Sequence, residues 1–202
     1  STLRFLIPVA AALGIRTTFL GQGRLPQRPI TAYLRELPKK GITFAYANTM
    51  PFTIEGQLQP GVYELEGDVS SQYVTGLILA LILLPGDSEI RMLSRLESKP
   101  YVDLTIACLR QFGAEVQETA SGYRIPGGQK LHACDQTVEG DYSQAAFFSV
   151  ANVLGSTIEL TNLNPKSVQG DKKIVEITEQ MCYNLKEGLP ACFSVDASDI
   201  PD

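Results

Sequence analysis

The sequence predicts an α/β fold built from repeated units of helices and short strands, with helices covering a mixed sheet on one side. Helical and strand-like periodicities alternate along the whole chain, which is typical of a layered α/β architecture. The tripeptide Glu-Gly-Asp occurs twice, at residues 66–68 and 139–141, each time just before a helical pattern. The interval between the two copies is longer than the period of solenoid repeats, so it indicates a larger internal structural repeat.

The first unit begins with a helix predicted over residues 2–13, capped by Ser1 or Thr2 and ended by a glycine. Pro8 should kink this helix or place its start later. Arg4 occupies the first turn, where the helix dipole disfavours a cation, so we expect an anion or a carboxylate to face it. The other elements of the unit are a strand, a helix and three strands, predicted at 17–20, 30–37, 42–46, 52–55 and 62–66.

The same order then recurs twice. The second unit is predicted to have helices and strands at 73–84, 89–93, 101–112, 114–117, 123–125 and 136–139. The third unit is predicted to have them at 143–154, 157–160, 172–183 and within 189–195. Ser1-Thr2, Ser70-Ser71 and Asp141 occupy corresponding helix starts in the three units.

The composition is that of a soluble globular protein, because 44% of the residues are hydrophobic and 19% are charged. A formal net charge of −5 argues against a surface that binds nucleic acid or an anionic membrane. The longest apolar run, residues 74–84, is too short to cross a bilayer. We therefore expect a cytoplasmic protein without nucleic-acid or membrane partners.

The four cysteines, Cys108, Cys134, Cys182 and Cys192, show no Cys-x-x-Cys spacing. With the single His132 they make a poor set of metal ligands, so the sequence predicts no metal site. Their apolar neighbours favour reduced thiols packed in the core over disulfides.

Ser70, Ser71 and Gln72 stand at the start of the most apolar predicted helix. Unpaired backbone N–H groups and the helix dipole favour an anion at such a position. Serine is also among the best N-capping residues, so capping alone is the competing interpretation.

Two further segments offer groups for an anionic ligand. Arg24 and Arg28 lie in a glycine-containing loop, and an arginine fork suits a carboxylate or a phosphate. Ser98 and Lys99 precede Tyr101 at another helix start, where they offer a hydroxyl and a cation. The competing interpretations are a solvated basic loop and a capped, proline-initiated helix.

The end of the sequence is rich in carboxylates. Asp196, Asp199 and Asp202 can raise one another's pKa, which suits a general base, although a polar, flexible terminus has the same pattern. No Ser-His-Asp set is available, because the single histidine is remote from these motifs. No glycine-rich nucleotide fingerprint is present either.

In this order the motifs resemble those of the 5-enolpyruvylshikimate-3-phosphate synthase family (3-phosphoshikimate 1-carboxyvinyltransferases). The resemblance covers essentially the whole chain and rests on Ser1-Thr2-Leu3-Arg4, Arg24-x-x-x-Arg28-Pro29, Gly67-Asp68-Val69-Ser70-Ser71-Gln72 and Ser98-Lys99-Pro100-Tyr101. It is extended by Glu139-Gly140-Asp141 and Asp199-Ile200-Pro201-Asp202. It implies an inside-out α/β barrel in two similar domains. Residues 1–138 would form most of the domain that binds shikimate 3-phosphate, and residues 139–202 would begin the second domain.

The resemblance also implies a reaction. The enolpyruvyl group of phosphoenolpyruvate is transferred to the 5-hydroxyl of shikimate 3-phosphate, with release of phosphate, in aromatic amino-acid (chorismate) biosynthesis. No organic cofactor takes part, the partners are the two small-molecule substrates, and we expect a monomer.

The roles implied by the resemblance are carried over residue by residue. Ser70, Ser71 and Ser98 would hold the 3-phosphate, and Tyr101 would pack beside the shikimate ring. Gln72 would lie between the two substrates. Arg24 would bind phosphoenolpyruvate, and Asp202 would contact shikimate 3-phosphate and deprotonate its 5-hydroxyl. The supporting residues would be Arg4, Arg28 and Lys99.

The sequence departs from the family pattern at both ends. The family's phosphoenolpyruvate site also needs a lysine and an arginine near the N-terminus, and a glutamate, two arginines and a lysine beyond residue 202. We therefore expect a chain truncated at both ends that retains shikimate 3-phosphate binding but lacks full activity. The alternatives are an enzyme like UDP-N-acetylglucosamine enolpyruvyl transferase and a non-catalytic binding fragment.

Overall fold

The computed structural model describes the backbone of residues 1–186 and the side chains of residues 1–181. Within it the chain divides into two units, of which unit 1 comprises Ser1–Ala133 and unit 2 begins at Cys134. The predicted strands within 189–195 and the predicted catalytic residue Asp202 lie outside the described residues.

The first half of unit 1 contains a three-stranded antiparallel sheet with the strand order β1-β3-β2. Its helices and strands are α1 (Thr2–Ala12), β1 (Thr17–Phe19), α2 (Thr31–Glu36), β2 (Ile42–Ala45) and β3 (Phe52–Gly56). Two short 3-10 helices, η1 (Leu25–Gln27) and η2 (Pro38–Lys40), lie in the connections. Pro8 lies inside α1, which begins at Thr2, so the later start, one of the two outcomes expected from the sequence, is wrong.

The second half of unit 1 contains a four-stranded mixed sheet with the strand order β4-β5-β7-β6. Its elements are β4 (Val62–Leu65), α3 (Ser71–Leu81), β5 (Ser88–Met92), α4 (Lys99–Gln111), β6 (Gln117–Thr119) and β7 (Gly122–Ile125). β4 and β5 are parallel and are joined through α3, whereas the other pairs are antiparallel. Two helix starts, those of α3 and α4, therefore follow the carboxyl ends of two adjacent parallel strands.

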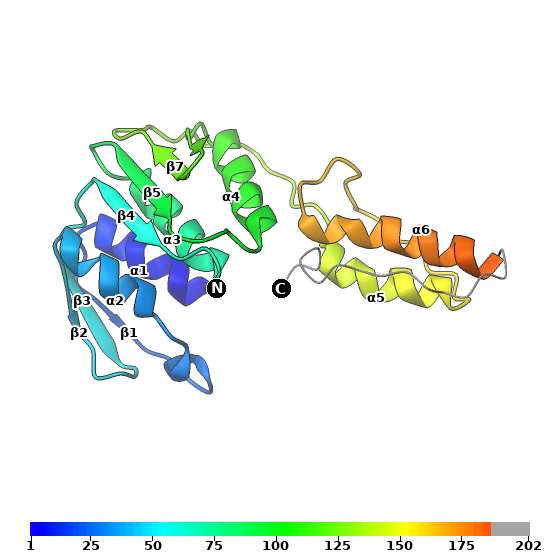
Figure 1. The fold of residues 1–202 in the computed structure, drawn as a ribbon, viewed down its shortest axis with the longest axis horizontal. Coiled ribbons are helices and arrows are strands. Elements are labelled where there is room, and N and C mark those ends of the chain that lie inside the picture. Colours follow the sequence, from blue (N-terminus) through cyan, green and yellow to red (C-terminus); the bar gives the residue numbers. More distant parts are fainter. Residues whose placement is uncertain (187–202) are drawn as a thin grey trace. The chain divides into compact units, whose positions relative to one another are not determined.

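In unit 1, α1 and α3 lie between the two sheets, and α4 packs beside α3 (Figure 1). α1 packs along α3, α1 contacts β3, and α3 contacts β5. This arrangement buries α3 on nearly every face, as its uniformly apolar sequence predicts. Gly76 permits the close approach of α3 to α1 and α2, because a Cβ at this position would lie 2.2 Å from the Tyr33 hydroxyl and 2.5 Å from the Arg4 carbonyl oxygen. This layering of helices and sheets agrees with the predicted α/β fold.

Unit 2 contains a helix pair over its described residues. α5 (Tyr142–Val153) packs against α6 (Lys173–Lys186), and the short 3-10 helix η3 (Gly170–Lys172) contacts both. Ser1, Ser70 and Asp141 are the N-cap residues of α1, α3 and α5, so the three predicted helix starts are confirmed.

Three strand predictions are wrong, and they share a cause. Residues 136–139 and 157–160 form no strand, and the strand predicted over 114–117 is displaced to β6. In each segment a side-chain amide binds the backbone groups that a neighbouring strand would bind. Asn162 donates to the Val138 carbonyl oxygen, Asn152 both donates to and accepts from Ile158, and Gln129 does the same with Glu115.

The prediction of cysteines packed in the core is wrong for Cys108 and Cys134, whereas the side chains of Cys182 and Cys192 lie outside the described residues. Cys108 and Cys134 form no disulfide, but both are exposed instead of packed in the core. Cys108 lies on an exposed face of α4, because the buried residues of that helix are Val102, Ile106 and Leu109. In the part of the chain that the structure describes, no helix is long and apolar enough to cross a membrane.

Candidate functional site

The α3 start is a capped helix N-terminus, and the hydroxyl of its cap donates to no residue that the structure describes. Ser70 has an extended backbone, and its Oγ accepts a hydrogen bond from the Gln72 backbone N–H at 3.3 Å. The same oxygen accepts a second hydrogen bond from Arg4. Two accepted bonds occupy both lone pairs of the hydroxyl and leave its hydrogen to donate. Ser70 therefore caps α3, as the competing interpretation holds. Capping is compatible with anion binding, because the Ser70 hydroxyl can still donate its hydrogen to an anion.

Arg4 brings a positive charge to the α3 start from the first turn of α1. Its Nη1 donates to Ser70 Oγ and to Gln72 Oε1, both at 3.2 Å, and its Nη2 donates to the Pro29 carbonyl oxygen at 3.2 Å. The guanidinium carbon lies 4.6 Å from the centre of the Tyr73 ring. Among residues 1–181, Arg4 forms no ion pair with a carboxylate. Its charge adds to the positive end of the α3 dipole, so the two together attract an anion.

Tyr73 and Gln72 fix the surroundings of this arginine. The Tyr73 hydroxyl donates to the Pro29 carbonyl oxygen at 2.7 Å, and burial raises the pKa of Tyr73, which keeps the donor protonated. Gln72 Nε2 donates to Ser1 Oγ at 3.2 Å. Gln72 thereby joins the N-cap serines of α1 and α3, because its carboxamide donates to Ser1 and its backbone N–H donates to Ser70.

The α4 start lies beside the α3 start. The Glu97 backbone N–H donates to the Gly67 carbonyl oxygen at 3.0 Å, which joins the loops that precede the two helices. Ser98 is the N-cap of α4 and has a left-handed backbone, with φ 52° and ψ 33°. Tyr101 is half-buried in the first turn of α4. The structure thus gathers the three predicted phosphate-site residues, Ser70, Ser71 and Ser98, together with Gln72, at two joined helix starts.

Lys99 is committed to ion pairs within unit 1. Its Nζ lies 2.7 Å from Asp103 Oδ1 and 3.2 Å from Glu118 Oε2. The hydrogen bond from Lys99 to Asp103 raises the pKa of the lysine, with a smaller contribution from Glu118. A lysine whose charge is balanced in this way anchors the α4 start to β6, which fits a supporting role.

Arg24 and Arg28 flank η1 and are exposed. The side chain of neither arginine forms a hydrogen bond or an ion pair with the residues that the structure describes. The segment that carries them is tied to the α3 start, because the carbonyl oxygen of Pro29 accepts from both Arg4 and Tyr73. Their forks remain available to a ligand.

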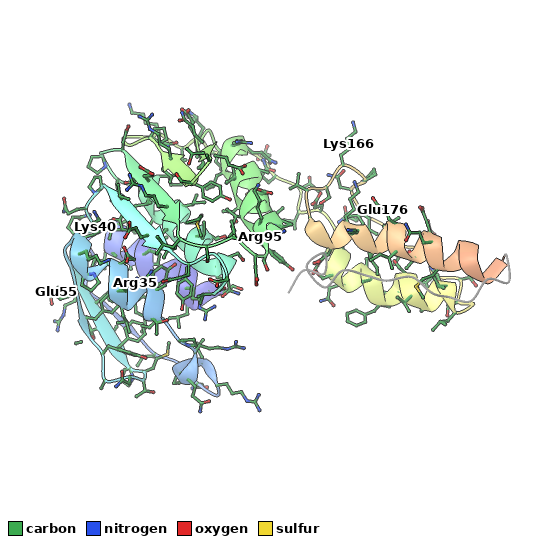
Figure 2. The ribbon with its side chains drawn as sticks, in the orientation of Figure 1. Arg35, Lys40, Glu55, Arg95, Lys166 and Glu176 are labelled. Atoms are coloured by element: carbon green, nitrogen blue, oxygen red, sulfur yellow. The ribbon has the colours of Figure 1, made fainter. Side chains whose placement is uncertain are left out.

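A pocket of about 240 Å³ lies beside the α4 start and includes residues that the sequence analysis did not single out. Its lining includes Ser94, Arg95, Lys99 and Tyr123. Arg95, labelled in Figure 2, is exposed in the loop that leads into α4. Its neighbourhood depends on the register of β4, β5 and β7, which no local sequence pattern gives. Over the described residues, no group of three His, Cys, Asp or Glu side chains could hold a metal ion.

The α5 start in unit 2 carries the opposite charge. Asp141 is its N-cap, and Asp141 Oδ1 accepts from the Ser143 backbone N–H at 2.9 Å. Glu139 accepts hydrogen bonds from Ser167, Gln169 and Asn164. A carboxylate at the cap repels a second anion, so the α5 start is a poor anion site.

Comparison with known proteins agrees with these features. The family model described as EPSP synthase (3-phosphoshikimate 1-carboxyvinyltransferase) matches residues 1–200. A 3-phosphoshikimate 1-carboxyvinyltransferase of Clostridium novyi is 41% identical over 213 residues, which cover 100% of this chain and 49% of the relative. The enzyme of that name from Clostridium kluyveri is 46% identical over 191 residues, covering 93% of this chain and 44% of the relative.

Solved structures give the same result. EPSP synthase from Acinetobacter baumannii aligns with a TM-score of 0.71 and 26% identity, covering 89% of this chain and 40% of the other. An enolpyruvyl transferase from Streptomyces tendae aligns with a TM-score of 0.54 and 19% identity, which is a likeness of fold. The chain spans about half the length of the curated relatives it matches.

Proposed function

The chain belongs to the EPSP synthase family, and on that premise we propose that it serves the transfer of an enolpyruvyl group from phosphoenolpyruvate to the 5-hydroxyl of shikimate 3-phosphate, with release of phosphate. In this proposal unit 1 supplies the seat of shikimate 3-phosphate. The protein acts in the cytoplasm as a monomer in aromatic amino-acid biosynthesis.

One observation carries the proposal. Arg4 faces the N-terminus of α3 with a hydroxyl, a carboxamide and a carbonyl as its partners, and it pairs with no carboxylate among the described residues. A helix N-terminus, a guanidinium and a serine with a free donor together match the needs of a phosphate group. Capping alone does not account for the arginine.

This geometry supports the proposed roles at the α3 and α4 starts, and the remaining roles are carried over from the family. Ser70, Ser71 and Ser98 bind the 3-phosphate, with Arg4 completing its charge balance. Gln72 faces the second substrate, and Tyr101 packs beside the ring. The two substrates are polyanions, so positioning and electrostatic stabilisation supply most of the catalysis. Arg24 takes phosphoenolpyruvate, Arg28 and Lys99 support the two loops, and Asp202 accepts the proton of the 5-hydroxyl.

Isothermal titration calorimetry tests the ligand. We expect saturable binding of shikimate 3-phosphate and none of UDP-N-acetylglucosamine. If only UDP-N-acetylglucosamine bound saturably, the proposed substrate would be wrong and the chain would instead resemble UDP-N-acetylglucosamine enolpyruvyl transferase in function. A phosphate-release assay with both substrates then separates binding from catalysis, because phosphate release that needs both substrates supports the transfer and binding without release limits the chain to ligand binding.

A further inference from the structure

A single serine binds the loops that precede α3 and α4 to each other. Ser94 Oγ accepts hydrogen bonds from the backbone N–H groups of Gly67, at 2.9 Å, and Asp68, at 3.4 Å. The same hydroxyl donates to Asp68 Oδ1 at 2.7 Å. One donor and two acceptor sites are all that a hydroxyl has, so Ser94 is fully engaged in this clamp.

The backbones of the two loops are also in direct contact. The Leu93 N–H donates to the Leu65 carbonyl oxygen at 2.8 Å, and the Glu97 N–H donates to the Gly67 carbonyl oxygen at 3.0 Å. A Cβ at Gly67 would lie 2.6 Å from the Arg95 carbonyl oxygen, so only glycine permits this approach. The loop carrying Arg95 (Figure 2) is therefore fixed to the loop that carries Ser70.

The clamp acts at residues that adjoin the phosphate-site hydroxyls. Ser98 directly follows Glu97 and has a left-handed backbone, which is costly for a residue with a Cβ and persists only where the surroundings hold it. Ser70 follows the other half of the clamp, Gly67 and Asp68. The relative position of the two helix starts thus depends on Ser94 and Asp68.

We propose that Asp68 and Ser94 are positioning residues of the phosphate site, which hold the α3 and α4 starts at the separation that lets Ser70 and Ser98 act on one ligand. This inference rests on the proposed function for the identity of that ligand, shikimate 3-phosphate. Neither residue touches the ligand, and each acts through the backbone of the loops.

The chain offers a matched control at the other end of the same pair of strands. Ser88 Oγ accepts a hydrogen bond from the Gly61 backbone N–H at 3.3 Å, at the start of β4 and β5. Ser88→Ala and Ser94→Ala each remove a serine hydroxyl that accepts from a glycine amide. Ser88 is 3% exposed, so its loss should cost at least as much stability. Only Ser94 lies at the helix starts.

The test is calorimetry with shikimate 3-phosphate on four variants, alongside thermal unfolding. We expect Ser94→Ala and Asp68→Ala to weaken binding about tenfold, the equivalent of about one hydrogen bond. Ser88→Ala should bind like the unaltered chain. Asp68→Asn should restore binding, because its amide oxygen still accepts from the Ser94 hydroxyl. Unchanged affinity in Ser94→Ala, or an equal loss in Ser88→Ala, would overturn the proposal.

Hydrogen exchange of the Glu97 amide in the ligand-free protein provides a second readout. The clamp predicts faster exchange of this amide in Ser94→Ala and unchanged exchange in Ser88→Ala. If the unaltered chain bound no shikimate 3-phosphate, the proposed function would fail while this measurement still decided the clamp. Equal Glu97 protection in Ser94→Ala and the unaltered chain would refute the clamp itself.

Discussion

The tripeptide Glu-Gly-Asp leads into two helices of this chain, α3 and α5, with different results. In both places the glycine lies against the backbone of a later loop, Gly67 against Arg95 and Gly140 against Asn162. At α5 the aspartate of the tripeptide is itself the N-cap. At α3 the chain continues through Val69, and the helix is capped by a hydroxyl.

This difference decides the charge at each helix start. At α5 the carboxylate of Asp141 occupies the positive end of the helix. At α3 the corresponding carboxylate, Asp68, binds Ser94, which leaves the cap position to Ser70 and the approach to Arg4. Two residues of additional chain thus convert a self-neutralised helix start into one that favours an anion.

The largest expected effect comes from giving α3 the cap of α5. Ser70→Asp should still cap the helix, as Asp141 does, because Asp and Ser are equally good caps. The new carboxylate would pair with Arg4 and repel phosphate. We expect the affinity for shikimate 3-phosphate to fall at least 100-fold, on the order of 3 kcal/mol, with little change in the unfolding temperature. Calorimetry and thermal unfolding measure both quantities.

Ser70→Asn is the matched neutral control, because it caps without a charge. It should retain much of the affinity. If Ser70→Asp bound within threefold of the unaltered chain, charge at the cap would not distinguish the two helix starts.

Removal of the arginine should have the next largest effect. Arg4→Gln keeps a polar side chain but loses the charge and the fork, so binding should weaken by about tenfold to 100-fold, as expected for charge-assisted hydrogen bonds. The affinity of Arg4→Lys should lie between that of the unaltered chain and that of Arg4→Gln, because lysine keeps the charge but loses the fork. Titrations at low and high salt check the electrostatic origin, because screening should weaken binding to the unaltered chain more than to Arg4→Gln.

Arg124→Gln serves as the control for a charge change in unit 1. Arg124 pairs with Asp87 at 3.0 Å and lies on β7. An equal loss of affinity in this variant would show that the net charge of the unit, and not Arg4, governs binding.

Substitution of the glycines in the two Glu-Gly-Asp tripeptides should have a smaller effect than the changes at Ser70 and Arg4, and this effect should be on stability. Gly67→Ala and Gly140→Ala each place a methyl group against backbone, at 2.6 Å from the Arg95 carbonyl oxygen and 2.7 Å from that of Asn162. Each should lower the free energy of unfolding by about 1–3 kcal/mol. Gly86→Ala, which meets only the Pro60 side chain at 3.0 Å, should cost less. Urea unfolding measures all three, and an undiminished stability of Gly67→Ala would refute the tight loop contact.

The smallest expected effect is the loss of stability when either glutamate of the repeated tripeptide, Glu66 or Glu139, is substituted. A hydrogen bond from Arg35 holds the pKa of Glu66 below its usual range, and hydrogen bonds from Ser167 and Gln169 do the same for Glu139. The two ionised carboxylates therefore stabilise the folded state above the unfolded-state pKa of about 4.3. This stabilisation is lost as the pH falls through their lowered folded-state pKa values.

Salt then distinguishes the two glutamates. Glu66→Gln should cost about 0.5 kcal/mol at neutral pH and low salt, and less at high salt, because it breaks an exposed ion pair. Glu139→Gln breaks hydrogen bonds to neutral groups, so its cost should not change with salt. Urea unfolding at two salt concentrations checks this, and an equal salt dependence would contradict the assignment.

The sequence predicted those features that depend on local patterns. The three N-cap positions, Ser1, Ser70 and Asp141, follow from the residue types and from the apolar runs behind them, although the Ser1 side chain forms no capping hydrogen bond. The partners of Arg4 could not be predicted in the same way. A facing carboxylate was one expectation, but the described residues place a hydroxyl and a carboxamide there. Helix starts could be predicted, whereas the groups brought to them from elsewhere could not.

The remaining features depend on non-local contacts. The bond between Ser94 and Gly67 exists only because β4 and β5 pair in one register. The wrong strand predictions have a similar origin, because alternation at 157–160 cannot reveal that the Asn152 side chain binds the backbone of Ile158. Such contacts have no periodic signal.

The most direct test of the account is a backbone amide NMR titration with shikimate 3-phosphate. The α3 start should respond, so the amides of Ser71 and Gln72 should shift in a saturable manner as ligand is added. The amides of Tyr142 and Ser143 at the α5 start should stay unchanged at the same concentrations. Shifts at the α5 start that equal or exceed those at α3 would contradict the claim that unit 1 seats the phosphate.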